Sequence, residues 1–164
     1  KLDRLATNHY WNAEADSMAV LPAGMAIPAQ GVTLFSGGGG LISTTMDYMV
    51  FLEMLRQGGS YNGVRILGPK TVQYMTIDQL TADVRNNGAD EFPASHLYPG
   101  QSGVISSMGE YSWGGAANTK FWVDPEEDLV AILMTQFLGS PWSDPTRFQM
   151  KVATYQALTE LNGN

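Results

Sequence analysis

Few side chains in this chain are suited to binding a metal ion. His9 and His96 are its two histidines, and neither has a second histidine or a carboxylate at the spacing of a zinc site. We therefore interpret both as surface or loop residues. The acidic residues between positions 124 and 128 superficially resemble a calcium loop, but the required glycine and the terminal glutamate are missing. A solvated hairpin turn is the better interpretation, and we expect neither a metal ion nor another cofactor.

Two glycine-rich stretches could bring the backbone close to a ligand or to neighbouring chain. Four successive glycines occupy residues 37–40, but no Gly-Lys-Ser/Thr follows them, so a phosphate loop is not indicated. Gly114 and Gly115 directly follow Trp113. From the residues alone, this second stretch predicts a glycine bulge beside a packed tryptophan. The chain has no cysteine, which excludes thiolate catalysis and disulfides.

The charge balance limits the classes of partner. The 164 residues include nine basic and sixteen acidic side chains, giving a net charge of -7 without any Lys/Arg cluster. A surface that tracks phosphates needs concentrated positive charge, so nucleic acid and anionic membranes are not expected as partners. No stretch approaches the ~18 consecutive apolar residues of a membrane span. Because the chain begins at Lys1 without methionine or an apolar leader, we expect a piece of a longer protein.

The strongest helix signal follows Thr44. Thr44 offers a cap hydroxyl, Asp47 lies three residues later as in a capping box, and Gly58-Gly59 would end the helix after about thirteen residues. Apolar residues recur within it at a spacing of three to four, which predicts one buried face. These residues are Met46, Met49, Val50, Phe51, Met54 and Leu55.

Shorter signals surround this helix. Asn62-Gly63 predicts a tight hairpin turn, and Pro69 predicts the start of a short helix that ends near Thr76. Residues 1–27 predict an irregular segment with short extended pieces at 8–12 and 18–21. The Asn-, Gly-, Ser- and Pro-rich residues 81–107 predict a long loop, which is usually functional or disordered.

The C-terminal third predicts an antiparallel sheet. Residues 110–115, 119–124 and 129–137 read as three strands, with a turn at residues 124–127 in which Pro125 presets the first central position. The uninterrupted apolar run 129–134 predicts a strand that is covered on both faces at the centre of the sheet. A final helix from Asp144-Pro145 would cover one face. Its apolar side would consist of Phe148, Val152, Tyr155, Leu158 and Leu161.

Two stretches together resemble a known family. They are SGGGGLISTTMDYMVFLEMLRQGGSYNGVRILGPKTVQYMT at residues 36–76 and GEYSWGGAANTKFWVDPEEDLVAILMTQ at residues 109–136. This combination resembles the serine β-lactamase-like and penicillin-binding-protein superfamily, and within it the class C β-lactamase-related esterases often called family VIII. The resemblance implies an α+β fold, with an antiparallel sheet packed with helices beside a helical subdomain. It also implies catalysis through an acyl-enzyme on the serine of a Ser-x-x-Lys motif. The lysine of that motif and the tyrosine of a Tyr-x-Asn motif would transfer the protons.

The resemblance assigns roles to four successive residues. Trp113 stands where typical members have the lysine of a Lys-Thr-Gly motif, and this branch has Trp-Gly-Gly instead. Gly114 and Gly115 continue that strand, and the backbone N–H of Ala116 would be a donor of the oxyanion hole. Such a donor stabilises the negative charge of a tetrahedral intermediate by ~3 kcal/mol.

The chain departs from the family pattern at the nucleophile. No serine precedes any lysine by three residues, so the Ser-x-x-Lys motif is absent from this chain. The residues three positions before Lys70, Lys120 and Lys151 are Leu67, Ala117 and Phe148. Tyr10-Trp11-Asn12 matches the second motif only in its letters, because in the family that motif lies further upstream.

These observations predict a single partial domain over residues 1–164. Residues 1–107 would be part of a helical subdomain with loops, and residues 108–164 the three-strand sheet with the C-terminal helix. The leading hypothesis is the C-terminal part of a serine hydrolase for ester or β-lactam-type amide bonds, inactive alone because nucleophilic catalysis needs an activated side chain. Its partners would be the N-terminal half of the same enzyme and a small-molecule ester or lactam substrate.

The alternative is a non-catalytic binding module. An exposed sheet edge offers unpaired N–H and C=O groups, through which the chain would bind another protein or form a homo-oligomer. The compartment stays open, because many members of the family are exported but this chain carries no signal for export.

Overall fold

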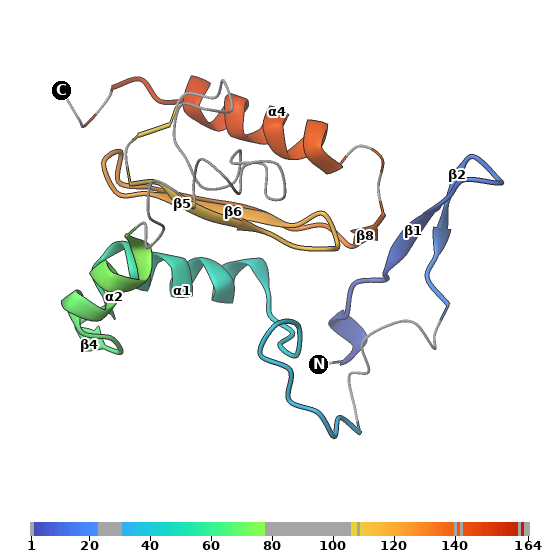
Figure 1. Ribbon diagram of the computed structural model, residues 1–164, viewed down its shortest axis with the longest axis horizontal. Coiled ribbons are helices and arrows are strands. Elements are labelled where there is room, and N and C mark those ends of the chain that lie inside the picture. Colours follow the sequence, from blue (N-terminus) through green and yellow to red (C-terminus); the bar gives the residue numbers. More distant parts are fainter. Residues whose placement is uncertain are drawn as a thin grey trace, which may run out of the picture.

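The computed structural model has a three-stranded antiparallel sheet at its centre (Figure 1). The strands follow the order β5 (Tyr111–Gly114), β6 (Lys120–Asp124) and β7 (Leu129–Leu133). The structure describes residues 2–22, 31–77, 106–107, 109–139, 141, 143–160 and 162. All three strands lie within one residue of the predicted starting positions.

Helices cover both faces of this sheet. Helix α1 (Thr45–Arg56) and helix α2 (Pro69–Thr76) lie on one face, and helix α4 (Ser143–Gln156) lies on the other (Figure 1). The predicted α+β class, an antiparallel sheet packed with helices, is confirmed.

Helix α1 begins where its cap residues predict. Thr44 Oγ1 accepts a hydrogen bond from Asp47 N at 3.1 Å and donates one to Asp47 Oδ2 at 2.9 Å. Gly58 and Gly59 follow the helix with φ values of 68° and 96°, which glycine adopts without steric cost. The local signals therefore located both ends of α1 correctly.

The buried side of α1 differs from the predicted stripe. Met54 and Leu55 are buried as expected, but Leu52, which lies outside the stripe, is fully buried. Met46 and Phe51 are exposed. The buried residues of α1 are Leu52, Met54 and Leu55, and the helix contacts both β6 and β7.

The elements after α1 confirm the short-range predictions. Strands β3 (Ser60–Tyr61) and β4 (Val64–Arg65) form a hairpin in which Asn62 and Gly63 have φ values of 47° and 79°, as expected for an Asn-Gly turn. Helix α2 has Pro69 in its first turn.

The centre of the sheet is β6 and not the predicted β7. Trp122, Val123 and Asp124 of β6 are fully buried, whereas only Ala131 of β7 is buried. Strand β7 still contacts α1 and α4, so its apolar run does reflect two contacted faces. The prediction of its central position is wrong because β6 pairs with a strand on each side.

The predicted strand 129–137 is divided into two strands. Strand β7 ends at Leu133, and β8 (Phe137–Leu138) follows after a break. Thr135 Oγ1 and Phe137 N both donate to Ala117 O, at 2.5 and 3.2 Å. These bonds draw the chain towards the turn between β5 and β6 and end the pairing with β6.

Strand β8 joins the N-terminal residues instead. After the short helix η1 (Leu2–Arg4), β1 (His9–Asn12) pairs antiparallel with β2 (Ser17–Val20) and parallel with β8. The extended pieces expected near positions 8–12 and 18–21 are therefore confirmed. The expectation that the segment is irregular is wrong, because β8 supplies a partner from the distant end of the chain. Residues 23–30 lie outside the described residues.

Two further expectations are not tested. The predicted loop 81–107 lies outside the described residues, apart from positions 106 and 107. The division of the chain into residues 1–107 and 108–164 stays a prediction.

Candidate functional site

The four residues assigned by the resemblance lie at the end of an edge strand. Trp113 and Gly114 are the last residues of β5, which pairs only with β6 among the described residues. Gly115 and Ala116 enter the turn that leads into β6. The Trp113 side chain is 69% exposed, so the predicted packed tryptophan is wrong.

Close neighbours restrict side chains at both glycines, at Gly115 more strictly than at Gly114. A Cβ atom on Gly115 would lie 2.2 Å from Thr119 Oγ1, and one on Gly114 would lie 3.3 Å from Arg147 Cζ. The first distance is shorter than any real contact, so a side chain at Gly115 would displace Thr119. The need for glycine here is therefore steric.

The turn after Gly115 is a short hairpin loop. Gly115 N donates to Thr119 O at 2.9 Å, and Asn118 N donates to Gly115 O at 3.1 Å. Asn118 is buried and has a φ of 62°. This pattern is typical of a three-residue loop, in which a type I turn is followed by a residue in the left-handed region.

The loop leaves the Ala116 amide available. Gly115 N points towards β6, and backbone groups alternate along an antiparallel strand, so the Ala116 N–H points away from the β6 ladder. Within the part of the chain that the structure describes, this N–H has no backbone acceptor. Ala116 is also exposed. The amide can therefore donate to an incoming oxygen, although its role as an oxyanion donor stays a prediction.

A small recess adjoins this loop on the α1 side of the sheet. Its volume is about 80 Å³. The lining residues are Tyr48, Trp113, Gly115, Thr119, Lys120, Phe121 and Met134. Aromatic and apolar side chains, together with Thr119 and Lys120, thus line the recess beside Gly115.

Tyr48 is a lining residue of this recess that the sequence did not single out. Its ring meets Phe121 edge-on, with centroids 5.7 Å apart, and stacks on Phe51 at 5.9 Å. Burial raises the pKa of Tyr48, so its phenol stays protonated at neutral pH. The only signal in the sequence was its position one turn after the Thr44 cap.

The opposite face of the sheet holds a polar network that was also missed. Tyr155 OH lies 2.7 Å from Asp124 Oδ2 and 3.0 Å from Glu110 Oε2, and Lys151 Nζ pairs with Glu110 at 2.7 Å. Burial, followed by hydrogen bonding to Asp124, raises the pKa of Tyr155 far above its ordinary value. The network connects α4 to Asp124 of β6 and to Glu110, the residue before β5.

Asp124 corrects the prediction of a fully solvated acidic turn. It is completely buried, and it also accepts hydrogen bonds from Ser107 N, Glu126 N and Glu127 N. Asp128, with a largely exposed side chain, pairs with Arg56. Asp124, the first residue of the turn, is therefore buried, whereas Pro125 and Glu126 are exposed to solvent.

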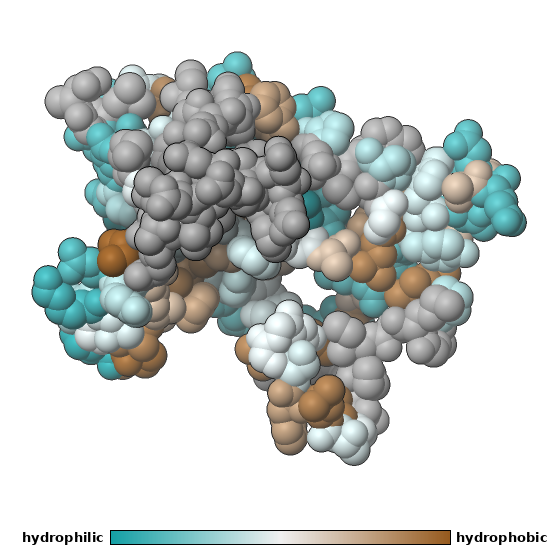
Figure 2. Space-filling view, viewed as in Figure 1, coloured by the Kyte–Doolittle hydropathy of each residue, from teal (hydrophilic) through white to brown (hydrophobic). Residues whose placement is uncertain are grey.

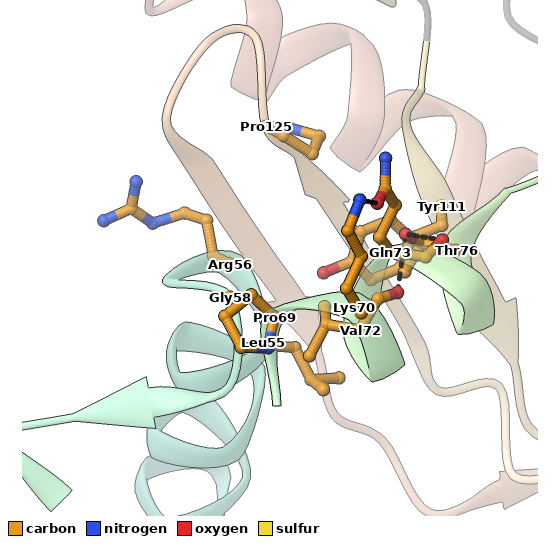
Figure 3. A pocket seen from close by; sticks show the side chains of 10 residues that line it. All are labelled: Leu55, Arg56, Gly58, Pro69, Lys70, Val72, Gln73, Thr76, Tyr111 and Pro125. Carbon is orange, nitrogen blue, oxygen red and sulfur yellow. Dashed lines mark hydrogen bonds between the residues drawn. The ribbon is translucent and has the colours of Figure 1, made fainter. Parts of the chain in front are cut away.

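A second pocket, larger than this recess, lies between α1, α2 and the β6–β7 turn (Figure 3). Its volume is about 420 Å³. Its polar groups bond within the chain, since Lys70 Nζ donates to Gln73 Oε1 at 2.9 Å and Arg56 pairs with Glu53. Burial raises the pKa of Tyr111, which lines this pocket, to about 12. None of the four predicted site residues lines it.

Of the two histidines considered as metal ligands, only His9 is within the described residues. Among the described residues, no group of three or more histidines, cysteines or carboxylates could hold a metal ion. His9 lies in β1, and His96 lies outside the described residues. No helix in the described ranges is both long and apolar enough to span a membrane.

Comparison with known proteins identifies the family. Residues 2–155 match the family model described as Beta-lactamase. This chain belongs to the beta-lactamase family. The resemblance to the serine β-lactamase-like and penicillin-binding-protein superfamily is thereby confirmed.

Relatives of this beta-lactamase family chain are longer than it is. Protein Rv1367c of Mycobacterium tuberculosis is 30% identical over 118 residues, which cover 62% of this chain and 29% of the relative. A putative D-alanyl-D-alanine carboxypeptidase of Escherichia coli O157:H7 is 25% identical over 158 residues, or 92% of this chain and 34% of the relative. The chain thus spans about a third of the length of these curated relatives.

A solved structure supports the same fold. Simvastatin synthase (LovD) from Aspergillus terreus superposes with a TM-score of 0.75 and 18% sequence identity. The alignment covers 97% of this beta-lactamase family chain and 44% of LovD. At this level of identity the likeness establishes the fold alone.

Proposed function

We propose that this chain supplies the oxyanion-donor strand of a serine hydrolase that acts on ester or β-lactam-type amide bonds. The Ser-x-x-Lys nucleophile, which residues 1–164 lack, comes from the N-terminal half of the same enzyme. The observation that carries the proposal is the Ala116 N–H, which has no backbone acceptor in the described part of the chain and belongs to an exposed residue directly after Gly115, a lining residue of the recess. Membership of the beta-lactamase family supports a serine hydrolase as the enzyme to which this arrangement contributes.

The proposed reaction assigns this chain one task. A serine oxygen from the N-terminal half attacks the substrate carbonyl, the leaving group departs with a proton, and water then hydrolyses the acyl-enzyme. During each attack the carbonyl oxygen becomes negatively charged. The Ala116 N–H donates to that oxygen and stabilises its negative charge.

The decisive variant is Ala116→Pro. Proline has no N–H, and Ala116 occupies the second position of the turn closed by Asn118 N and Gly115 O, where proline fits. The substitution therefore removes the donor and keeps the loop. Ala116→Ser keeps the N–H and is the matched control.

The assay is hydrolysis of a p-nitrophenyl ester by the chain mixed with a polypeptide that carries the Ser-x-x-Lys segment. We expect hydrolysis only in the mixture, with Ala116→Pro lowering kcat by about 10²- to 10³-fold and Ala116→Ser leaving it nearly unchanged. Equal kcat for the two variants would refute the role of Ala116.

A second candidate function is assembly without catalysis, through the exposed sheet edge. It is favoured by β5, which pairs on one side only within the described residues, and by apolar side chains exposed in the segment before α1. There Leu34 is 76%, Phe35 91% and Leu41 95% exposed. Apolar surface is visible along this segment in the space-filling view (Figure 2). A homo-oligomer would bury these groups.

Sedimentation measurements separate the two candidates. Assembly predicts a mass that rises with protein concentration and is reduced by Phe35→Ser or by Trp113→Lys on the β5 edge. A constant monomer mass at all concentrations would exclude the homo-oligomer and leave the hydrolase proposal.

A further inference from the structure

Arg147 of α4 reaches across to the loop that contains Ala116. Its Nη2 atom donates a hydrogen bond to Gly115 O at 2.5 Å. Its guanidinium lies against Gly114, where the position of a Cβ would be 3.3 Å from both Cζ and Nη1. Because Gly114 has no side chain, the Arg147 guanidinium can pack against it and reach Gly115 O.

The carbonyl that Arg147 binds belongs to the same peptide group as the Ala116 N–H. A peptide group is planar and trans, so its C=O and N–H point in opposite directions. An anchor on Gly115 O therefore fixes the direction of the Ala116 N–H. Asn118 N gives a second anchor on the same oxygen at 3.1 Å, and two donors restrict the peptide more than one would.

Arg147 also changes the strength of the donor. A hydrogen bond from a charged guanidinium is stronger than one from a neutral amide. It polarises the peptide group that accepts it, and hydrogen bonds in a chain strengthen one another in this way. The Ala116 N–H consequently carries more positive charge than an ordinary backbone amide.

We infer that Arg147 is a positioning residue that orients and polarises the Ala116 N–H for an oxyanion. The inference rests on the proposed function for its catalytic meaning, but the orientation of the peptide is testable without it. A tie that only holds α4 against the β5–β6 loop is the competing account, and it predicts a loss of stability without a specific effect on Ala116.

The first experiment is NMR spectroscopy of the labelled chain. Arg147→Met keeps the apolar stem and removes the donors. Arg65→Met is the matched control, because Arg65, like Arg147, donates hydrogen bonds to the backbone. Its acceptors are Gly58 O and Leu67 O, at the β3–β4 hairpin and not at the β5–β6 loop. We expect Arg147→Met to shift the Gly115 carbonyl carbon and the Ala116 amide, with faster solvent exchange at Ala116, and Arg65→Met to leave both unchanged. Unchanged Gly115 and Ala116 resonances in Arg147→Met would overturn the inference.

The second experiment is a double-mutant cycle in the ester-hydrolysis mixture. Arg147→Met should lower kcat by about tenfold, less than loss of the donor itself, with little change in KM. In the Ala116→Pro background the same change should have no further effect on kcat, since the group through which Arg147 acts is already gone. Equal losses in both backgrounds would identify a purely structural tie. If the mixture shows no hydrolysis at all, the proposed function fails, and the NMR result still decides whether Arg147 orients the peptide.

Discussion

Replacement of Tyr155 by phenylalanine tests the polar network that holds α4 on the sheet. The substitution removes one hydroxyl, which lies 2.7 Å from Asp124 Oδ2 and 3.0 Å from Glu110 Oε2. Asp124 is completely buried, so water cannot replace the lost donor. Three backbone amides still donate to Asp124 in the variant, which limits the loss in the free energy of unfolding.

The expected cost follows from these contacts. A hydrogen bond to a charged group contributes about 1.5–3 kcal/mol, and we expect Tyr155→Phe to lower the free energy of unfolding by about 2 kcal/mol. The matched control is Tyr61→Phe, since Tyr61 packs against the core and its hydroxyl makes no hydrogen bond within the described residues. The control should change the free energy by less than about 0.5 kcal/mol.

The pH dependence adds a second signature. The folded protein raises the pKa of Tyr155 above its ordinary value, so the phenol stays protonated while the unfolded chain ionises near pH 10. The contribution of Tyr155 to stability is therefore complete below pH 10 and is lost as the pH rises above it, by at most about 1.4 kcal/mol per pH unit. The wild-type chain should lose stability between pH 10 and 11.5 more steeply than Tyr155→Phe.

Urea unfolding followed by circular dichroism at pH 7 and over that alkaline range measures both effects. If Tyr155→Phe equals Tyr61→Phe in free energy and shows the wild-type slope above pH 10, the network does not hold α4. A destabilisation above about 4 kcal/mol would mean that the three amides do not support Asp124 as described.

Two substitutions in and before α1 test its packing and its cap. Leu52→Ala should lower the free energy of unfolding by about 2–5 kcal/mol, because Leu52 is fully buried, and a loss below about 1 kcal/mol in urea unfolding would contradict its central position. Thr44→Ala should cost about 1 kcal/mol by removing the acceptor for Asp47 N, whereas Thr44→Ser should be nearly neutral; equal loss in both variants would show that the cap bond is not the cause.

Local features of this fold were predictable from sequence because nearby residues determine them. The cap at Thr44, the Asn62-Gly63 turn and Pro69 at the start of α2 each act within a few residues of their own position. The same holds for the turn at Pro125. Each of these elements lies where the sequence predicted it.

The errors came from contacts between distant parts of the chain. The end of β7 depends on Ala117 O, which accepts hydrogen bonds from Thr135 and Phe137. The pairing of β8 with β1 joins residues near both ends of the chain. Periodicity within a segment contains no information about such partners.

At the candidate site, too, features set by nearby residues were predictable and features set by distant contacts were not. The family resemblance singled out Gly114, Gly115 and Ala116, whose role stays a prediction, but it did not indicate that Trp113 is exposed. It also gave no sign that Arg147 would lie over Gly114, since an arginine on a helix usually faces solvent. The burial of Asp124 was missed because its partners Tyr155 and Ser107 are distant in sequence.

The central claim is that this chain provides the oxyanion donor and not the nucleophile. Intact-mass spectrometry of the purified chain after incubation with a fluorophosphonate, and separately with a chromogenic β-lactam, tests it most directly. We predict an unmodified mass for the chain alone and a single adduct on the Ser-x-x-Lys polypeptide in the mixture. A stoichiometric adduct on a serine of this chain would contradict the account.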